Sequence, residues 1–233
     1  MAGSNDNEAP GLSALACEKR LYFIRHGKTA WNDQFRYQGA TDIPLSDEGR
    51  RQANAASARF AKVQVDTLLC SPLSRAFETA SIIAGAHPSL RPMRVPELTE
   101  VNFGGWEGLT VPQIKEKYGE ELFARWRGAQ LDVTAPMGEE MDALWLRSAS
   151  AAERILSCAG KNIVVVGHGA MFRVLFLSLL SLPRTNIFWK TRLDNCSISA
   201  FSCDKEGRAT LSYLNDVTHL KLSAKQIEIL PSP

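Results

Sequence analysis

Ile163-Val164-Val165-Val166-Gly167-His168-Gly169, residues 163–169, is the stretch that decides the fold of this chain. Four β-branched residues in succession are typical of a parallel strand that is buried on both faces of a sheet. A second short apolar run, residues 21–24, leads into the similar sequence Arg25-His26-Gly27. Each run therefore predicts a buried strand that ends in a loop carrying a histidine next to glycine.

Predicted strands and helices alternate along most of the remaining chain. Helices are expected over residues 46–62, 72–86, 112–127, 139–158 and 170–182, with a further strand over residues 66–70 and a loop rich in Pro and Gly over residues 87–111. Residues 197–202 and 209–213 flank a turn and predict a hairpin. This order favours an α/β three-layer sandwich, in which a mainly parallel sheet has helices on both faces.

Length and composition place the chain among ordinary globular proteins. It has 233 residues, of which 45% are hydrophobic and 22% charged, and its net charge of +2 favours neither nucleic acid nor an anionic membrane as a partner. The longest apolar stretch, residues 174–182, is too short to span a bilayer. Residues 1–19 resemble a disordered leader rather than a signal peptide. Residues 20–233 are expected to form a single domain.

The cysteines argue for a reducing compartment. There are five of them, an odd number, and none form a C-x-x-C pair, so neither a disulfide framework nor a zinc site is indicated. The cytoplasm is the expected location.

Two histidines follow separate predicted strands, and their loops are expected to meet. The carboxyl ends of parallel strands converge on the ligand crevice in open α/β sheets, which would bring His26 and His168 to one edge. Arg25 precedes His26, and Arg75 lies at the start of the helix that follows residues 66–70. Guanidinium groups clamp phosphate oxygens, and helix N-termini add backbone donors. Each residue alone is more often a solvated or locally bonded side chain, but together they favour a phosphate site.

At these positions the chain resembles the histidine phosphatase superfamily, which includes cofactor-dependent phosphoglycerate mutases. The family signature R-H-G-x-T-x-x-N is close to residues 25–32, Arg-His-Gly-Lys-Thr-Ala-Trp-Asn. Further motifs match in order, and the resemblance runs from about residue 20 to about residue 220: Gln38-Gly39, Asp42-Ile43-Pro44-Leu45-Ser46, Ser71-Pro72-Leu73-Ser74-Arg75-Ala76, Thr79-Ala80, Leu98-Thr99-Glu100, Phe103-Gly104-Gly105-Trp106-Glu107-Gly108, Val166-Gly167-His168-Gly169, Asn195-Cys196-Ser197 and Leu214-Asn215-Asp216.

The resemblance implies a role for each matched residue of the phosphate pocket. His26 is expected to be the nucleophile that becomes a phosphohistidine. Arg25, Asn32, Arg75 and His168 are expected to line the pocket. Neutral imidazole is a good nucleophile near neutral pH, and fixed donors and cations best meet the charge on a transferring phosphoryl group.

The resemblance also implies a proton donor and two weaker substrate contacts. Glu100 is expected to protonate the leaving oxygen. Glu97 and Glu107 lie close enough in sequence to be rivals, and only Glu100 matches the family's position. Gln38 and Gly39 are expected to approach the substrate, Gly39 because a missing Cβ admits backbone donors.

A phosphomonoester hydrolase acting on a small phosphorylated metabolite is the function that this resemblance favours. The alternative is a phosphoglycerate mutase, but mutases of the family carry paired arginines after a tryptophan and a lysine after the glutamate motif. Here Trp126-Arg127-Gly128 keeps one arginine, and Leu109-Thr110-Val111 offers no lysine. A non-catalytic phosphate-binding module would lack the nucleophile, an arginine or the proton donor, and all are present.

No metal and no cofactor are expected, because arginines and histidines supply the charge and no carboxylate cluster suited to Mg²⁺ accompanies them. The sequence leaves two properties open, the identity of the phosphomonoester and the oligomeric state.

Overall fold

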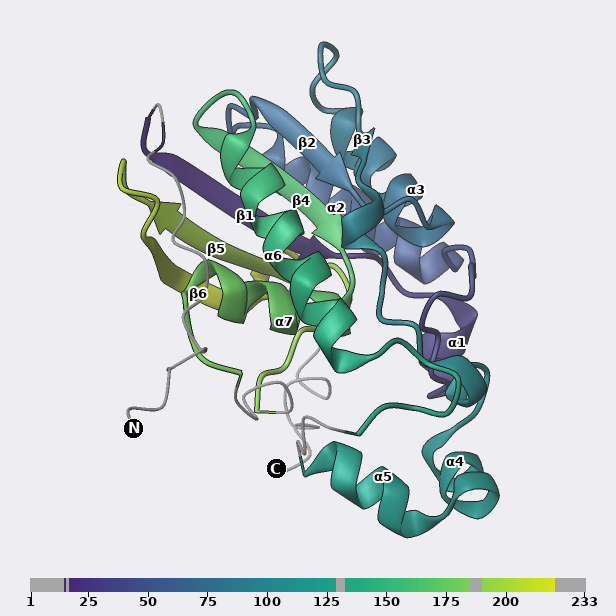
Figure 1. The fold of residues 1–233 in the computed structure, drawn as a ribbon. Helices are drawn as coiled ribbons and strands as arrows, with labels where there is room; N and C mark the ends of the chain where they lie inside the picture. The colour runs from purple at the N-terminus through teal and green to yellow at the C-terminus, as the bar shows by residue number, and fades with distance from the viewer. Residues whose placement is uncertain (1–14, 16, 129–132, 185–189, 221–233) are drawn as a thin grey trace, which may run out of the picture.

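A computed structural model of the chain describes residue 15 and residues 17–128, 133–184 and 190–220. Its centre is a six-stranded sheet with the order β3-β2-β4-β1-β5-β6, which crosses the molecule diagonally in Figure 1. The strands are β1 (Lys19–Arg25), β2 (Thr67–Cys70), β3 (Met93–Arg94), β4 (Asn162–Gly167), β5 (Ile198–Cys203) and β6 (Ala209–Asp216).

The sheet has a parallel half and an antiparallel edge. Strands β1, β2, β3 and β4 pair in parallel, and the register of the central pair places Arg25 opposite Gly167. Strand β5 is antiparallel to β1, and β6 is antiparallel to β5, which confirms the predicted hairpin. The carboxyl ends of β1, β2 and β4 consequently lie together, and the loops that follow these strands leave the sheet at that end.

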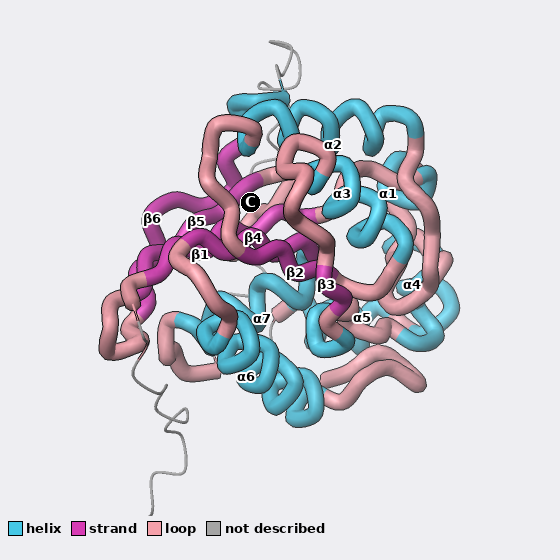
Figure 2. The backbone as a smooth tube through the Cα atoms, turned by 90° about the horizontal axis from the view of Figure 1, so that it is seen from above, coloured by secondary structure: helices cyan, strands magenta, loops and turns pink. Residues whose placement is uncertain are grey.

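Helices cover both faces of the sheet, which confirms the predicted α/β architecture. Figure 2 shows α2 (Asp47–Phe60) and α3 (Ser74–Ala84) on one side, and α6 (Met141–Ser157) and α7 (Gly169–Leu179) on the other. Strand β4 serves both sides because its side chains alternate: Val164 and Val166 join the core under α2 and α3, whereas Val165 joins the core under α6 and α7. Burial on both faces explains the run of β-branched residues.

The helix predicted over residues 112–127 is two helices. Gly119 separates α4 (Val111–Tyr118) from α5 (Glu120–Arg127), and its φ of +92° is a conformation that side chains disfavour and that ends the first helix. Both helices extend away from the sheet at the bottom of Figure 1. Four short elements complete the described chain: α1 (Ala30–Asp33) and the 3₁₀ turns η1 (Pro96–Leu98), η2 (Gly104–Trp106) and η4 (Thr218–Leu220).

An aromatic cluster joins α5 to the loop that follows α1. The ring of Tyr37 lies 5.2 Å from that of Phe103 and 5.7 Å from that of Trp126, and Trp106 and Trp126 are 4.9 Å apart between centroids. This packing holds α5 against the loop after α1 and the η2 turn. None of the described helices is long and apolar enough to cross a membrane.

Candidate active site

His26 and His168 lie side by side at the carboxyl end of the parallel strands. His26 directly follows β1, and His168 directly follows β4. The backbone N–H of His26 donates to the carbonyl of Gly167 at 2.9 Å, which ties the two loops together. The centroids of the two imidazole rings are 5.1 Å apart.

Hydrogen bonds distinguish the ring nitrogens of the two histidines. Nδ1 of His26 lies 2.7 Å from the carbonyl of Gly27. Because a carbonyl can only accept, this Nδ1 carries the proton and Nε2 keeps the lone pair. Nε2 of His168 lies 2.7 Å from Oγ of Ser71, and its buried Nδ1 has no partner among the described residues.

Both histidines are held in the neutral form. Their side chains are buried, His26 at 2% exposure and His168 at 0%. Burial lowers the pKa of each well below its ordinary value, and the positive charge of Arg75 lowers it further. A neutral imidazole with a free Nε2 is the form that attacks an electrophile.

Arg75, in the first turn of α3, places a buried cation near the two histidines. Its Nη1 donates to the carbonyl of Thr41 at 2.8 Å and its Nη2 to that of Gly39 at 2.7 Å, while Nε has no partner among the described residues. A guanidinium has five N–H donors, so several are left for an anion. Burial lowers the pKa of Arg75 to about 10, and the group therefore stays cationic at neutral pH.

Arg25 lies beside the N-terminus of α7. Its Nη1 donates to the carbonyl of Leu193 at 2.6 Å. A Cβ added to Gly169 would lie 3.4 Å from Nε of Arg25, an ordinary van der Waals distance that places the guanidinium against the first residue of this helix. Burial lowers the pKa of Arg25, and the charge of Glu100 acts in the opposite direction.

Asn32 and Gln38 are placed around Thr29 at the rim of the pocket. Oδ1 of Asn32 accepts from N and Oγ1 of Thr29, each at 3.1 Å, and from Nδ2 of Asn195 at 3.3 Å. The same amide of Asn195 donates to the carbonyl of His26 at 3.0 Å. Oε1 of Gln38 accepts from Thr29 Oγ1 at 3.0 Å. Any contact between Asn32 and a phosphate would therefore be made by its amide nitrogen.

Two structural features of Gly39 disfavour any other residue at this position. Its φ is +55°, and an added Cβ would lie 2.0 Å from Oε1 of Glu107. The Glu107 carboxylate accepts from the backbone N–H groups of Ala40 at 2.9 Å and Thr41 at 3.0 Å, and from the Thr41 hydroxyl. Glu107 therefore holds the loop that caps Arg75, and Gly39 admits this carboxylate.

Glu100 approaches the histidines from the loop after η1. Its Oε1 accepts from the N–H groups of Met171 at 2.8 Å and Val101 at 3.0 Å, and its Oε2 accepts from that of Ala170 at 3.2 Å. Ala170 and Met171 belong to the first turn of α7, directly after His168. A carboxylate is favoured at a helix N-terminus. The structure thus brings Glu100, rather than Glu107, to the loop that carries a histidine.

Two hydroxyl groups of the pocket were not identified from the sequence. Ser71 is fully buried and bonds His168 across 97 positions of chain. Oγ1 of Thr79 accepts from the N–H of Gly27 at 3.1 Å and donates to the carbonyl of Arg75 at 2.7 Å. Both lie in the matched motifs around residues 71–80, but only their strand-to-helix location hinted at a role.

Arg173 was also missed, because it lies in a segment that is otherwise apolar. Its Nε donates to the carbonyl of Thr191 at 3.0 Å. Burial and the charge of Arg25 lower the pKa of Arg173 to about 10, and Glu100 raises it. The pocket is therefore bordered by a further cation.

Within the part of the chain that the structure describes, no group of three or more His, Cys, Asp or Glu side chains is arranged so that it could hold a metal ion.

The chain is similar in sequence or structure to proteins named as phosphatases and as phosphoglycerate mutases or mutase-like proteins. Residues 21–216 match the model of the histidine phosphatase superfamily, branch 1. Phosphoserine phosphatase 1 of Hydrogenobacter thermophilus is 31% identical over 86% of this chain and 94% of its own length. Phosphoglycerate mutase-like protein 4 of Arabidopsis thaliana is 34% identical over 86% of each chain. The crystal structure of the alpha-ribazole phosphatase from Shigella flexneri has a TM-score of 0.76 at 29% identity and covers 84% of this chain and 96% of its own.

The family match spans both histidine loops, Arg75 and Glu100, and the structural match covers 84% of the chain. It confirms the resemblance inferred from the motifs and, with the phosphatases among the relatives, the expected enzyme class. The chain therefore belongs to the histidine phosphatase superfamily, branch 1.

Proposed function

We propose that the protein hydrolyses a small phosphorylated metabolite through a covalent phosphohistidine on His26. The bond between Nδ1 of His26 and the carbonyl of Gly27 carries this proposal, because it leaves the lone pair of Nε2 free in a pocket lined by cations. A phosphate dianion suits a pocket in which Arg25 and Arg75 are cationic and both histidines are neutral. Catalysis by such preorganised groups is largely electrostatic.

The first half-reaction transfers the phosphoryl group to the enzyme. Nε2 of His26 attacks phosphorus, the P–O bond to the leaving group breaks, and the charge on the phosphoryl oxygens is met by Arg25, Arg75, His168 and the amide of Asn32. Glu100 gives its proton to the leaving oxygen, which departs as an alcohol.

The second half-reaction releases inorganic phosphate. Water attacks the phosphohistidine, and the ionised Glu100 takes its proton. The N–P bond breaks, which returns the lone pair to Nε2 of His26. The same carboxyl group therefore serves as acid and then as base.

Hydrolysis, rather than phosphoryl return to a second hydroxyl, is favoured by the residues around α5. A mutase must enclose a carboxylated substrate with additional cations, whereas here Arg127 is followed by Gly128 and residues 109–111 contain no lysine. Phosphoglycerate mutase remains the second candidate, since the relatives include proteins with that name.

The domain bounds, the location and the partners of the protein are proposed from its sequence and its cysteines. We take residues 20–233 as one catalytic domain with a leader over residues 1–19, which lies mostly outside the described residues. The free state of all five cysteines supports a cytoplasmic location. Small phosphorylated molecules are the expected partners, with no role for nucleic acid or membrane.

Acid-quench trapping with a ³²P-labelled phosphomonoester, in EDTA, tests the proposal. A phosphoenzyme that is labile in acid and stable in base, absent from His26→Ala, is the expected result. An acid-stable label, or activity that EDTA removes and a divalent ion restores, would contradict it. A panel of sugar phosphates, phosphoglycerates, phosphoserine, nucleotides and alpha-ribazole phosphate, compared by kcat/KM, separates the substrate classes and detects mutase products.

A further inference from the structure

Arg147 forms a fork between α6 and the loop that carries Glu100. Its Nε and Nη2 donate to the two carboxylate oxygens of Glu139 at 2.7 Å and 2.6 Å. Its Nη1 donates to the carbonyls of Glu97 at 2.8 Å and Thr99 at 2.7 Å, and lies 3.3 Å from Sδ of Met171. One guanidinium therefore joins the start of α6, the η1 turn and the first turn of α7.

Glu139 bonds the backbone that follows Glu100 in the chain. Its backbone N–H donates to the carbonyl of Asn102 at 2.8 Å, and its carboxylate accepts from the N–H of Asn102 at 3.4 Å. Glu97 and Thr99 lie before Glu100 in sequence, and Asn102 lies after it. The Arg147–Glu139 pair thus fixes the backbone on both sides of the residue whose own carboxylate rests on Ala170 and Met171.

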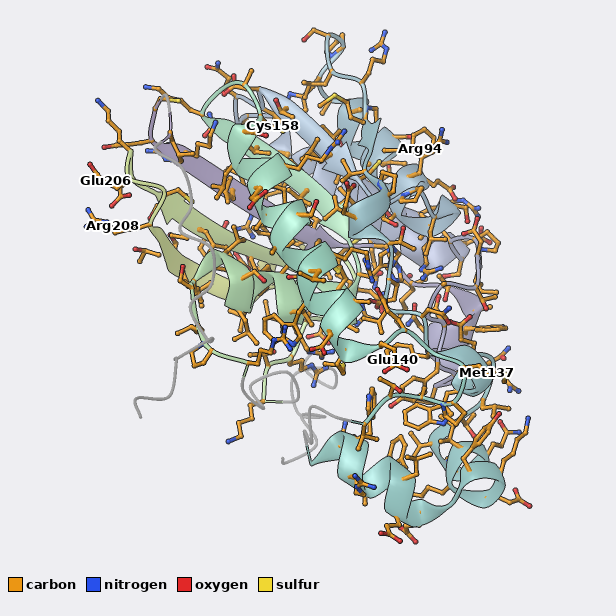
Figure 3. All side chains as sticks on the ribbon, in the orientation of Figure 1. Arg94, Met137, Glu140, Cys158, Glu206 and Arg208 are labelled. Atoms are coloured by element: carbon orange, nitrogen blue, oxygen red, sulfur yellow. The ribbon has the colours of Figure 1, made fainter. Side chains whose placement is uncertain are left out.

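The position of the pair in the fold suits this role. Figure 3 shows Glu140 at the end of α6 near the carboxyl edge of the sheet and Cys158 at the opposite end. Both side chains are largely enclosed, with 20% of Arg147 and 16% of Glu139 exposed. A bidentate pair with this burial keeps a single geometry better than an exposed ion pair does.

We infer that Arg147 and Glu139 are positioning residues that set where the Glu100 carboxyl meets the leaving oxygen. The inference rests on the proposed function, because it assigns the pair a role in the proton transfer by Glu100. Neither residue needs to touch the substrate. They act through the carbonyls of residues 97 and 99 and the amide of residue 102, and a misplacement of about 1 Å at a reacting group can cost about 10²-fold in rate.

A series of aryl phosphates from phenyl to p-nitrophenyl phosphate tests the inference, because nitrophenolate leaves without a proton and phenolate depends on one. Arg147→Met should lose about 10- to 100-fold in kcat/KM on phenyl phosphate and much less on p-nitrophenyl phosphate. Arg147→Lys, which keeps the charge without the fork, should fall between Met and wild type. Arg59→Met is the matched control, since it breaks the partly buried pair with Asp216 on the α2 side. Its dependence on the leaving group should equal that of wild type.

A double-mutant cycle separates positioning from a general structural effect. In a Glu100→Gln background, Arg147→Met should cost almost nothing more on phenyl phosphate, because the proton donor is already gone. Equal losses of Arg147→Met on both esters, or additive losses in the cycle, would overturn the inference. If Arg147→Met does not fold, Arg147→Lys and Glu139→Gln carry the same two measurements.

The outcome also distinguishes this inference from the proposed function. If Glu100→Gln itself shows no contrast between the esters, the assignment of the acid fails and the pair has nothing to position. If Glu100→Gln shows the contrast and the Arg147 and Glu139 variants do not, the inference alone fails.

Discussion

The loop after β1 and the loop after β4 share one local pattern, a buried parallel strand followed by a histidine beside glycine, yet they place the two imidazoles in different states. Nδ1 of His26 bonds the carbonyl of the next residue, Gly27, and Nε2 has no hydrogen bond to any residue that the structure describes. His168 uses Nε2 to bond Ser71 on a neighbouring strand end. His168 also precedes an 11-residue helix whose first N–H groups hold Glu100.

The hydrogen-bond partner, rather than the motif, therefore distinguishes the two roles. In the proposed mechanism the β1 loop presents the nucleophilic nitrogen of His26. The β4 loop carries His168, and the helix that follows it holds the Glu100 carboxylate, the proposed proton donor. Variants that exchange or remove these features test whether the division holds.

The largest difference is expected between His26→Ala and His168→Ala. Without its nucleophile, His26→Ala should lose on the order of 10⁴-fold or more in kcat and form no phosphoenzyme. His168→Ala loses one electrostatic contact to the phosphoryl group, worth about 10²–10³-fold, and should still form phosphoenzyme slowly. Rapid-quench measurement of a single turnover gives both values. Phosphoenzyme in His26→Ala, or none in His168→Ala despite native circular dichroism, would reverse the assignment.

The next effect concerns the carboxylate that the β4 loop holds. Glu100→Gln should slow hydrolysis of phosphoserine, an alkyl ester, by about 10²–10⁴-fold more than hydrolysis of p-nitrophenyl phosphate. An alkoxide needs a proton to leave, whereas nitrophenolate needs little help. Gln keeps the size of the side chain. If both substrates slow equally in the phosphorylation step, Glu100 is not the acid. If only dephosphorylation slows, it serves the attacking water alone.

Features of this site that depend on neighbouring residues could be predicted from the sequence, whereas hydrogen bonds between residues far apart in the chain could not. The strands and the positions of His26 and His168 could be predicted because β-branched runs and adjacent glycines are neighbours in the chain. The bonds that divide their roles could not: Ser71 reaches His168 across 97 residues, and Asn195 reaches His26 across 169. Pairing of this kind depends on the strand order of the sheet, which no local pattern encodes.

Two glycines show which structural details could not be predicted from the sequence. Residues 112–127 have the composition of one helix, but the positive φ at Gly119 breaks it in two. The approach of Gly39 to substrate stays a prediction, and the sequence did not indicate that its missing Cβ makes room for Glu107, 68 positions later in the chain. Only Gly39 was singled out from the sequence, and for both glycines the contact or the backbone conformation that requires them is known only from the three-dimensional arrangement.

A smaller effect is expected when the hydrogen bond between Ser71 and His168 is removed. Ser71→Ala removes the partner of Nε2 in His168, a single buried hydrogen bond worth about 1 kcal/mol, or roughly 5-fold. We expect a loss of that size in kcat/KM. The dependence on the leaving group should stay unchanged, because the N–H groups of Ala170 and Met171, and not Ser71, hold the Glu100 carboxylate. Ser74→Ala, beside the same helix start but bonded to Asp42, is the control. A loss as large as that of His168→Ala would mean that Ser71 decides the whole function of the histidine.

The smallest effect is on stability, and it tests whether both histidines are neutral when folded. Burial, followed by the charge of Arg75, lowers their folded pKa well below the 6.5 of an unfolded histidine. The unfolded chain then binds more protons below pH 6.5. The free energy of unfolding is therefore undiminished above pH 6.5 and falls as the pH drops, by up to about 1.4 kcal/mol per pH unit for each histidine.

Replacing one histidine should remove its share of this slope. Urea titrations at pH 7.5, 6.5 and 5.5 should show His168→Asn losing less stability between pH 6.5 and 5.5 than wild type does, by about 1 kcal/mol. The pKa of His219 is lowered too, by burial, and its contribution remains in both proteins and cancels. Identical slopes for His168→Asn and wild type would mean that His168 takes up its proton in the folded protein, and the contrast between the two loops would then rest on His26 alone.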